Sequence, residues 1–250
     1  MSASPVVPVD VLAFGPHPDD VELGCGGTLA LLAGRGRGIG IVDLTRGEMA
    51  TRGTPGTRAA EAAEAARLLG ARFRANLDLG DGDLRTDRAA QLLVIEAVRR
   101  ARPRLVLAPW TEDRHPDHER AGRLVSESAW YAGLGKLETG LPAYRPDQVV
   151  FYAAYALLQP TFLVDVSASF ETKLAALRAY RSQFHDAAAA TSGEPETYVS
   201  SKSFWAGVEA RARAYGRVAN IAYAEGFVSK NPPTLADPAA AFLGYEGARP

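Results

Sequence analysis

Short apolar runs alternate with helix-forming segments along the first half of this chain, and this alternation constrains the fold more than any other feature. The runs have the length and composition of buried strands and lie at residues 9–14, 39–44, 72–77 and 105–108. The segments after them indicate helices at 28–34, 58–70, 89–102 and 119–131. Strands that alternate with helices form right-handed βαβ units, so the pattern predicts a mostly parallel sheet.

The second half of the chain is less regular. It indicates strands at 149–156 and 162–166, helices at 170–181 and 203–219, and a loop around Gly193 between those helices. No shift in composition divides the 250 residues, so we expect a single α/β domain over 1–250. The tail from about residue 230 is rich in proline and is expected to wrap the surface.

Charge and cysteine content exclude several classes of protein. The net charge of −1 gives no overall attraction to nucleic acid or to an anionic membrane. The single cysteine cannot form an internal disulfide, which favours a reducing compartment, and we expect a cytoplasmic protein. No apolar run has the roughly 18 residues of a membrane-spanning helix, and the first ten residues do not resemble a signal peptide.

Two short acidic clusters hold three of the four histidines. The first is HPDD at 17–20, directly after the first expected strand, and the second is HPDH at 115–118, after the strand at 105–108. In open parallel sheets, ligands bind outside the carboxyl ends of the strands. Either cluster alone is compatible with a surface turn, but two such clusters at strand ends predict a common site.

The residue types in these clusters favour a metal. A tight turn brings His17 and Asp20 to one side, and His118 is available as a third ligand from the other loop. Two imidazoles, one carboxylate and an open position are what a catalytic Zn²⁺ requires. Fe²⁺ in an oxygenase is the alternative, but oxygenases usually carry a tighter His-x-Asp pair on a β scaffold, so we favour a hydrolytic zinc site.

Three further polar residues complete a hydrolytic site. Asp19 lies beside a ligand and is placed to take the proton of the attacking water. His115, held by Asp117, is placed to face the developing oxyanion or to protonate the leaving group. These roles require the two clusters to meet across the edge of the sheet.

Other features are open to two interpretations. The glycine run at 24–28 does not have the G-x-G-x-x-G spacing, so we expect helix entry and close packing around a buried Cys25 rather than a dinucleotide site, although a non-enzymatic metal- or nucleotide-binding module stays open. Arginines in the 45–58 loop are ordinarily solvated, but Arg58, at a helix start, is a candidate to clamp a substrate carboxylate. Tyr198 reaches the site only if its loop folds back.

Several long segments resemble one known family. They are AFGPHPDDVELGCGGT, GEMATRGTPGTR, APWTEDRHPDHERAGRLV, ALRAYRSQF and ARARAYGRVANIAYAEGF, which together span most of the chain. They are similar to the LmbE/PIG-L family of zinc-dependent N-acetylglucosaminyl deacetylases. The last blocks resemble its bacterial branch that deacetylates N-acetylglucosaminyl malate in bacillithiol biosynthesis.

The resemblance implies roles for the residues of both clusters. The family's zinc ligands match His17, Asp20 and His118, and its general base matches Asp19. The remaining two matches are the imidazole that stabilises the oxyanion and the group that orients it, at His115 and Asp117. A metal-dependent N-deacetylase is the enzyme that these matches imply.

The resemblance also implies substrate contacts, a fold and an assembly. Arg58 matches an arginine at the substrate end of the site, and Tyr198 is the nearest candidate for a family tyrosine that reaches the oxyanion. The fold is expected to be Rossmann-like, with helices on both faces of the sheet, and the chain to form a homo-oligomer, a trimer or a hexamer. The substrate is expected to be a small aminosugar conjugate, with a chitobiose-like oligomer or another glycoconjugate as the alternative to the malate.

Overall fold

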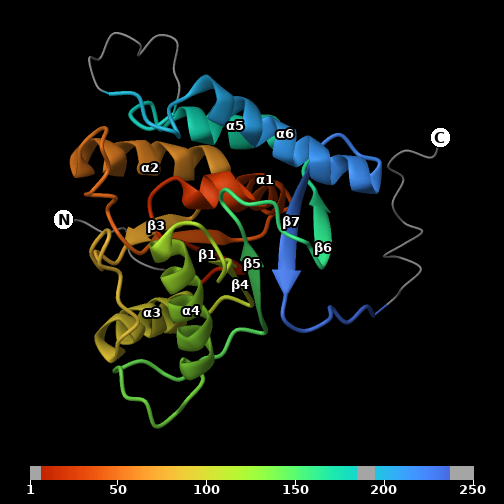
Figure 1. Cartoon of the computed structure of the whole chain (residues 1–250). Coiled ribbons are helices and arrows are strands. Elements are labelled where there is room, and N and C mark those ends of the chain that lie inside the picture. The colour runs from red at the N-terminus through yellow and green to blue at the C-terminus, as the bar shows by residue number, and fades with distance from the viewer. Residues whose placement is uncertain (1–6, 185–194, 237–250) are drawn as a thin grey trace.

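The computed structural model describes residues 7–184 and 195–236, which form one seven-stranded sheet between two layers of helices (Figure 1). The strand order is β3-β2-β1-β4-β5-β7-β6. Strands β1 to β5 are parallel, and β7 runs antiparallel to both of its neighbours, β5 and β6. In chain order the elements are β1 (Val11–Gly15), α1 (Asp20–Gly34), β2 (Ile39–Asp43), α2 (Pro55–Leu69), β3 (Phe73–Asn76), α3 (Arg88–Ala101), β4 (Leu105–Pro109), α4 (Pro116–Tyr131), β5 (Gln148–Tyr152), β6 (Phe162–Asp165), α5 (Phe170–Arg178), α6 (Lys202–Ala219) and β7 (Ala224–Ser229).

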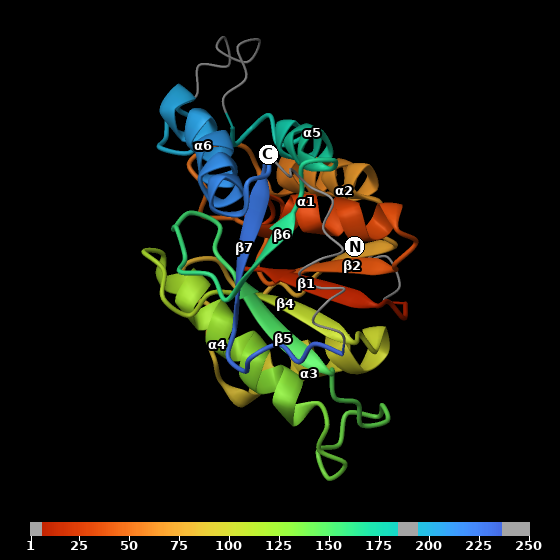
Figure 2. The ribbon, with the colours of Figure 1, turned by 90° about the vertical axis from the view of Figure 1, so that its right-hand side faces the viewer.

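Helices cover both faces of the sheet, which explains why its central strands are apolar throughout. Helices α1, α2, α5 and α6 lie on one face, and α3 and α4 lie on the other (Figures 1 and 2). Ile39 and Ile41 of β2 pack into the hydrophobic core beneath α1 and α2, while Val42 on the same strand packs into the core beneath α3 and α4. A strand buried on both sides has no polar face. The expected α/β fold, with a mostly parallel sheet and helices on both faces, is confirmed.

The order in which the chain adds strands to the sheet changes direction at β1. The chain adds β2 and β3 on one side of β1 and then returns to place β4 and β5 on the other side. Strands β1 and β4 are therefore adjacent and parallel, with Val11 opposite Leu105 and Ala13 opposite Leu107. Such a switch point leaves a crevice at the carboxyl ends of the two strands. The loops that follow β1 and β4 open into this crevice.

Three helices begin earlier than their apolar patterns indicated. Helix α1 starts at Asp20 rather than at residue 28, α2 at Pro55 rather than 58, and α4 at Pro116 rather than 119. Proline is well tolerated in the first turn of a helix because no intrahelical bond needs its missing N–H. The Thr54 side chain also accepts a hydrogen bond from the amide of Thr57 and so caps α2. Apolar periodicity alone did not detect these polar first turns.

Strand β7 was not predicted from the sequence. It inserts between β5 and β6 and carries Glu225, which is buried although it is charged. A buried carboxylate interrupts the apolar pattern from which strands are recognised. Gly226 leaves room for Tyr215, whose ring would lie 2.8 Å from a Cβ at this position.

Helix α1 is broken near its middle. Cys25 has φ −142° and ψ 16°, which is outside the helical region, and its side chain is fully buried. Gly24 packs directly against the ring of Tyr152, where a Cβ would collide, and a Cβ on Gly27 would lie 2.9 Å from Val166. The expectation that these glycines serve close packing around a buried cysteine is confirmed.

Some sequence expectations fall partly or wholly outside the described residues. Gly193 and most of the expected surface tail are among these, while residues 231–236 at the start of the tail are exposed. In the part of the chain that the structure describes, no helix is both long and apolar enough to span a bilayer.

Candidate metal centre

The two histidine clusters meet at the switch point of the sheet. His17 lies in the turn between β1 and α1, and Asp20 is the first residue of α1. His115 is the N-cap residue of α4, and His118 lies in the first turn of that helix. The imidazole rings of His17 and His118 have centroids 5.6 Å apart, although about 100 positions separate the residues. The sequence expectation that the clusters converge is therefore met by the geometry.

Asp20 lies between the two histidines. Its Oδ2 is 3.1 Å from Nδ1 of His17 and 3.3 Å from Nε2 of His118. Each of these three residues offers one ligand atom, and the three atoms lie within 4.8 Å of one another. Nitrogen and oxygen donors at this spacing suit Zn²⁺ or another divalent transition metal.

Two buried atoms of this group support a cation. Oδ1 of Asp20 has no hydrogen-bond partner among the described residues, and Nε2 of His118 has only its 3.3 Å ion contact with Oδ2 of Asp20, although both residues are almost fully buried. Such atoms are ordinarily paired, and a bound metal would satisfy them. His17 also forms a second possible group with His115 and Asp117. The carboxylate of Asp117 already accepts hydrogen bonds from the amide of Gly82 and from Arg120, so the group that contains Asp20 fits a metal better.

In each candidate ligand histidine, the ring nitrogen that does not face Asp20 contacts a second carboxylate. Oδ1 of Asp81 lies 2.9 Å from Nε2 of His17, and Oδ2 of Asp113 lies 3.4 Å from Nδ1 of His118. Carboxylates in this position fix the orientation and the tautomer of a metal-binding imidazole. Neither residue was singled out from the sequence. Asp113 precedes HPDH in the same loop, which is the only local signal, whereas Asp81 comes from the loop after β3.

Neighbouring carboxylates raise the pKa values of both candidate ligand histidines. Burial opposes a charged ring, but the carboxylates of Asp20 and Asp113 outweigh it and raise the pKa of His118 to about 9. Burial likewise opposes charge on His17, and hydrogen bonds with Asp117, Asp20 and Asp81 raise its pKa well above the usual value. Metal binding to these rings must therefore release protons.

Asp19 is held in a strained and buried position. Its φ of 114° lies in a region that residues other than glycine rarely adopt, and its side chain is almost inaccessible. Burial raises the pKa of Asp19 to about 7, against the opposing charge of Arg58. Backbone strain of this kind persists only where the surroundings enforce it, and here it sets the base candidate beside Asp20, the candidate ligand.

Arg58 contacts the base candidate. Its guanidinium lies 3.0 Å from Oδ2 of Asp19 and donates to the carbonyls of Pro18 and Gly47, and the residue is only 4% exposed. We expected an arginine that clamps a substrate carboxylate. The structure instead places its charge against Asp19, so a contact with substrate stays a prediction.

His115 and Asp117 meet through the backbone. The amide of Asp117 donates to Nδ1 of His115 at 3.2 Å, whereas the carboxylate of Asp117 accepts from the amide of Gly82 and from Arg120. We expected this carboxylate to orient the ring, and no such contact is formed. Because Nδ1 accepts a hydrogen bond, the ring proton is assigned to Nε2, which is then a donor. Burial and the neighbouring rings of His17 and His118 lower the pKa of His115.

Tyr198 lies at the outer edge of the site. It is 61% exposed, and the guanidinium carbon of Arg114 lies 4.5 Å from its ring centroid and 4.9 Å from that of Tyr155. The Tyr155 ring in turn lies 5.4 Å from the ring of His118. The loop before α6 therefore folds back towards the site. Arg114 and Tyr155, which join Tyr198 to the histidines, were not recognised in the sequence.

Comparisons with known proteins agree with this arrangement. The model of the PIG-L family, GlcNAc-PI de-N-acetylase, matches residues 12–129, which include both clusters. The diacetylchitobiose deacetylase of Thermococcus kodakarensis is 34% identical over 191 residues, which are 70% of this chain and 70% of that protein.

Two solved structures share both the fold and substantial sequence identity. The conserved protein TT1542 from Thermus thermophilus superposes with a TM-score of 0.80 at 43% identity, covering 91% of this chain and 97% of that one. The N,N'-diacetylchitobiose deacetylase from Pyrococcus horikoshii, in complex with its inhibitor, has a TM-score of 0.75 at 30% identity over 88% of this chain and 83% of that one. The oxygenase and non-enzymatic interpretations are therefore set aside. The chain belongs to the PIG-L family of de-N-acetylases and is an amide hydrolase.

Proposed function

We propose that this chain is a zinc-dependent hydrolase that removes the N-acetyl group from an N-acetylglucosaminyl conjugate. The observation that carries the proposal is the convergence of His17, Asp20 and His118, with buried atoms on two of them that form no hydrogen bond among the described residues. The deacetylase names of the related proteins supply the bond that is cleaved. When bound, a divalent cation supplies Lewis acidity to the acetyl carbonyl and to the attacking water.

Residues next to the proposed ligands transfer the proton and stabilise the charge that develops on the acetyl oxygen. Asp19 accepts the proton of the attacking water on its carboxylate, and Arg58 holds that carboxylate in place at 3.0 Å. His115, with its proton on Nε2, donates to the acetyl oxygen as that oxygen gains charge. The water oxygen bonds to the acetyl carbon, the carbon–nitrogen bond of the amide then breaks, the amine takes the proton that Asp19 accepted, and acetate leaves.

We further propose that the conjugate is N-acetylglucosaminyl malate, as in bacillithiol biosynthesis. Support comes from Arg114, which is exposed beside His115 and has no carboxylate partner among the described residues. Its guanidinium carbon lies 4.9 Å from the ring centroid of Tyr155 and 4.5 Å from that of Tyr198, contacts with ring faces that leave N–H groups to bind a carboxylate of the malate. Arg114, rather than the buried Arg58, is then the arginine that recognises the anionic group.

A chitobiose-like substrate is the second candidate. Two of the related proteins are named diacetylchitobiose deacetylases, and one of them is 34% identical to this chain. That substrate has no carboxylate, so its hydrolysis should not depend on the charge of Arg114. The two candidates therefore differ in one measurable way.

The test measures acetate release by the zinc-loaded protein from both substrates, with Arg114→Met and, as a control, Arg123→Met on the exposed side of α4. A charge-assisted hydrogen bond contributes about 1.5–3 kcal/mol, so Arg114→Met should raise the KM for the malate conjugate by about 10- to 100-fold. The KM for diacetylchitobiose should not change. Hydrolysis of diacetylchitobiose alone would favour the second candidate, and acetate release from neither substrate would refute the deacetylase proposal for both.

A homo-oligomer, a trimer or a hexamer, stays a prediction of the resemblance. Light scattering by the purified chain measures its mass and tests that prediction.

A further inference from the structure

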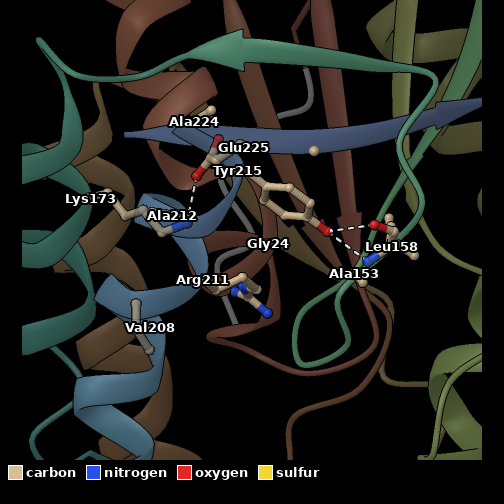
Figure 3. Close-up of a pocket in the computed structure, with 11 residues that line it drawn as sticks. Gly24, Ala153, Leu158, Lys173, Val208, Arg211, Ala212, Tyr215, Ala224 and Glu225 are labelled. Carbon is tan, nitrogen blue, oxygen red and sulfur yellow. Dashed lines mark hydrogen bonds and ion pairs between the residues drawn. The ribbon is translucent and has the colours of Figure 1, made fainter. Parts of the chain in front are cut away.

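A cluster of three charged residues, two of them buried and one partly buried, lies against the turn of α1 that begins at Asp20, here called the metal-binding turn. Lys173 of α5 and Glu225 of β7 are 2% and 3% exposed and form an ion pair, and Arg211 of α6, which is partly exposed, lines the same pocket (Figure 3). The cavity that these side chains line has a volume of about 10 Å³, enough for roughly one water molecule. The charged groups therefore act on the protein itself and not on a larger ligand.

All three side chains bind the broken part of α1. In a continuous helix, the amide of Gly27 would donate to the carbonyl of Leu23. Here the amide of Gly27 donates to Oε1 of Glu225 at 3.0 Å, and the amide of Thr28 donates to Oε2 at 2.8 Å. The carboxylate of Glu225 thus caps the second half of the helix.

The carbonyl side of the break is bound by two cations. The ammonium of Lys173 donates to the carbonyl of Leu23 at 2.9 Å, and the guanidinium of Arg211 donates to the same oxygen at 2.7 Å. Lys173 also pairs with Glu225 at 2.5 Å, so one connected cluster satisfies both ends of the break. Leu23 is three residues after Asp20, within the turn that begins at the ligand.

Arg211 also connects this turn to the opposite side of the site. Its second terminal nitrogen donates to the carbonyl of Ala154, in the segment after β5. The next residue, Tyr155, packs its ring against His118. A single guanidinium therefore holds both the turn that carries Asp20 and the segment that lies against His118.

Buried charges are costly in the absence of a compensating role. Burial lowers the pKa of both Lys173 and Arg211, which is the direction expected for cations removed from water. Two cations face one carboxylate in this cluster, so neutralisation alone does not account for Arg211. The hydrogen bonds to Leu23 and Ala154 do account for it.

We propose that Arg211, Lys173 and Glu225 are positioning residues for the metal-binding turn. They hold α1 in its broken form and so set the distance between Asp20 and His118. The inference rests on the proposed metal site, and it concerns residues that touch neither metal nor substrate. Arg211 and Tyr215 belong to the ARARAYG block, for which the sequence offered no chemistry.

The variants are chosen to keep the fold while removing the contacts of Arg211 and Glu225 with the broken part of α1. Arg211→Lys keeps the positive charge, but one ammonium does not reproduce the planar fork that reaches two carbonyls. Glu225→Gln keeps an oxygen that accepts from the helix amides and removes the charge opposite Lys173. Arg213→Lys is the matched control, because Arg213 lies on the same helix in an exposed ion pair with Glu209.

The measurement is zinc affinity by competition with a chromogenic chelator, next to thermal melting of the metal-free proteins. Loss of outer partners of metal ligands weakens metal affinity by about 10- to 100-fold, and we expect a loss in this range for Arg211→Lys and Glu225→Gln but not for Arg213→Lys. With zinc in excess, kcat should fall for both variants while KM stays unchanged, because the cluster does not contact substrate.

The outcomes separate this inference from the function that it rests on. Wild-type zinc affinity in folded Arg211→Lys and Glu225→Gln would overturn the inference and leave the proposed function intact. Loss of the fold in both variants would also overturn it, since the cluster would then be a general part of the core. Failure of the wild-type chain to bind zinc would overturn the proposed metal site, and the inference with it.

Discussion

Removal of the guanidinium of Arg74 should destabilise the whole domain. Arg74 on β3 lies 2.5 Å from Oε1 of Glu22 and 2.7 Å from Oδ2 of Asp43, and all three side chains are at most 7% exposed. Arg74→Met fills most of the same space but leaves two buried carboxylates without their cation. Glu22 keeps its hydrogen bond from Tyr180, so the minimum consequence is one uncompensated buried charge.

A buried charge that loses its partner costs about 3–5 kcal/mol. For a chain of this size each kcal/mol lowers the Tm by about 2–4 °C, so we expect Arg74→Met to melt about 6–20 °C below the wild type. The melts are recorded in a chelator, because bound metal would raise the Tm of both proteins by mass action.

The control is Arg67→Met, which removes an ion pair with Glu64 in which both side chains are exposed. Pairs of that kind contribute little, so its Tm should match the wild type. If Arg74→Met melted no lower than Arg67→Met, the reasoning that this buried pair is structural would be refuted.

Three further predictions concern the site and the break in α1. Asp19→Asn should reduce turnover by about 100- to 10,000-fold and retain zinc, whereas Asp20→Asn should lose zinc; the reverse pattern in metal analysis would exchange the two roles. Asp113→Asn should weaken zinc binding by about 10- to 100-fold in chelator competition, and an unchanged affinity would remove Asp113 from the site. Gly24→Ala should lower the free energy of unfolding by about 1–3 kcal/mol in urea, because its Cβ would enter the ring of Tyr152; a stability equal to the wild type would contradict the packing described here.

The central strands were predictable because burial on both faces leaves a plain apolar signal. The convergence of the two clusters was predictable for a related reason: parallel strands place their following loops at one edge of the sheet. The residue types in the clusters indicated a hydrolytic metal site, and the resemblance of several segments to one family then indicated the bond that is cleaved. None of these steps required knowledge of a side-chain conformation.

Contacts between distant polar residues could not be predicted. Asp81 is 64 positions from His17, and no pattern within the chain relates the two. The direction of the Arg58 guanidinium, towards Asp19 and not towards substrate, depends on how the 45–54 loop packs. Strand β7 was missed because Glu225 interrupts it, although the same carboxylate is what caps the broken helix.

The break in α1 also changes the electrostatic field at the proposed metal site. An unbroken helix carries about half an elementary charge, positive, at its N-terminus, and Asp20 begins α1. That pole would repel a divalent cation held by Asp20. The break at Cys25 divides the helix dipole in two, and the carboxylate of Glu225 neutralises the positive end of the longer half. A cation at Asp20 therefore faces the dipole of little more than one turn of helix.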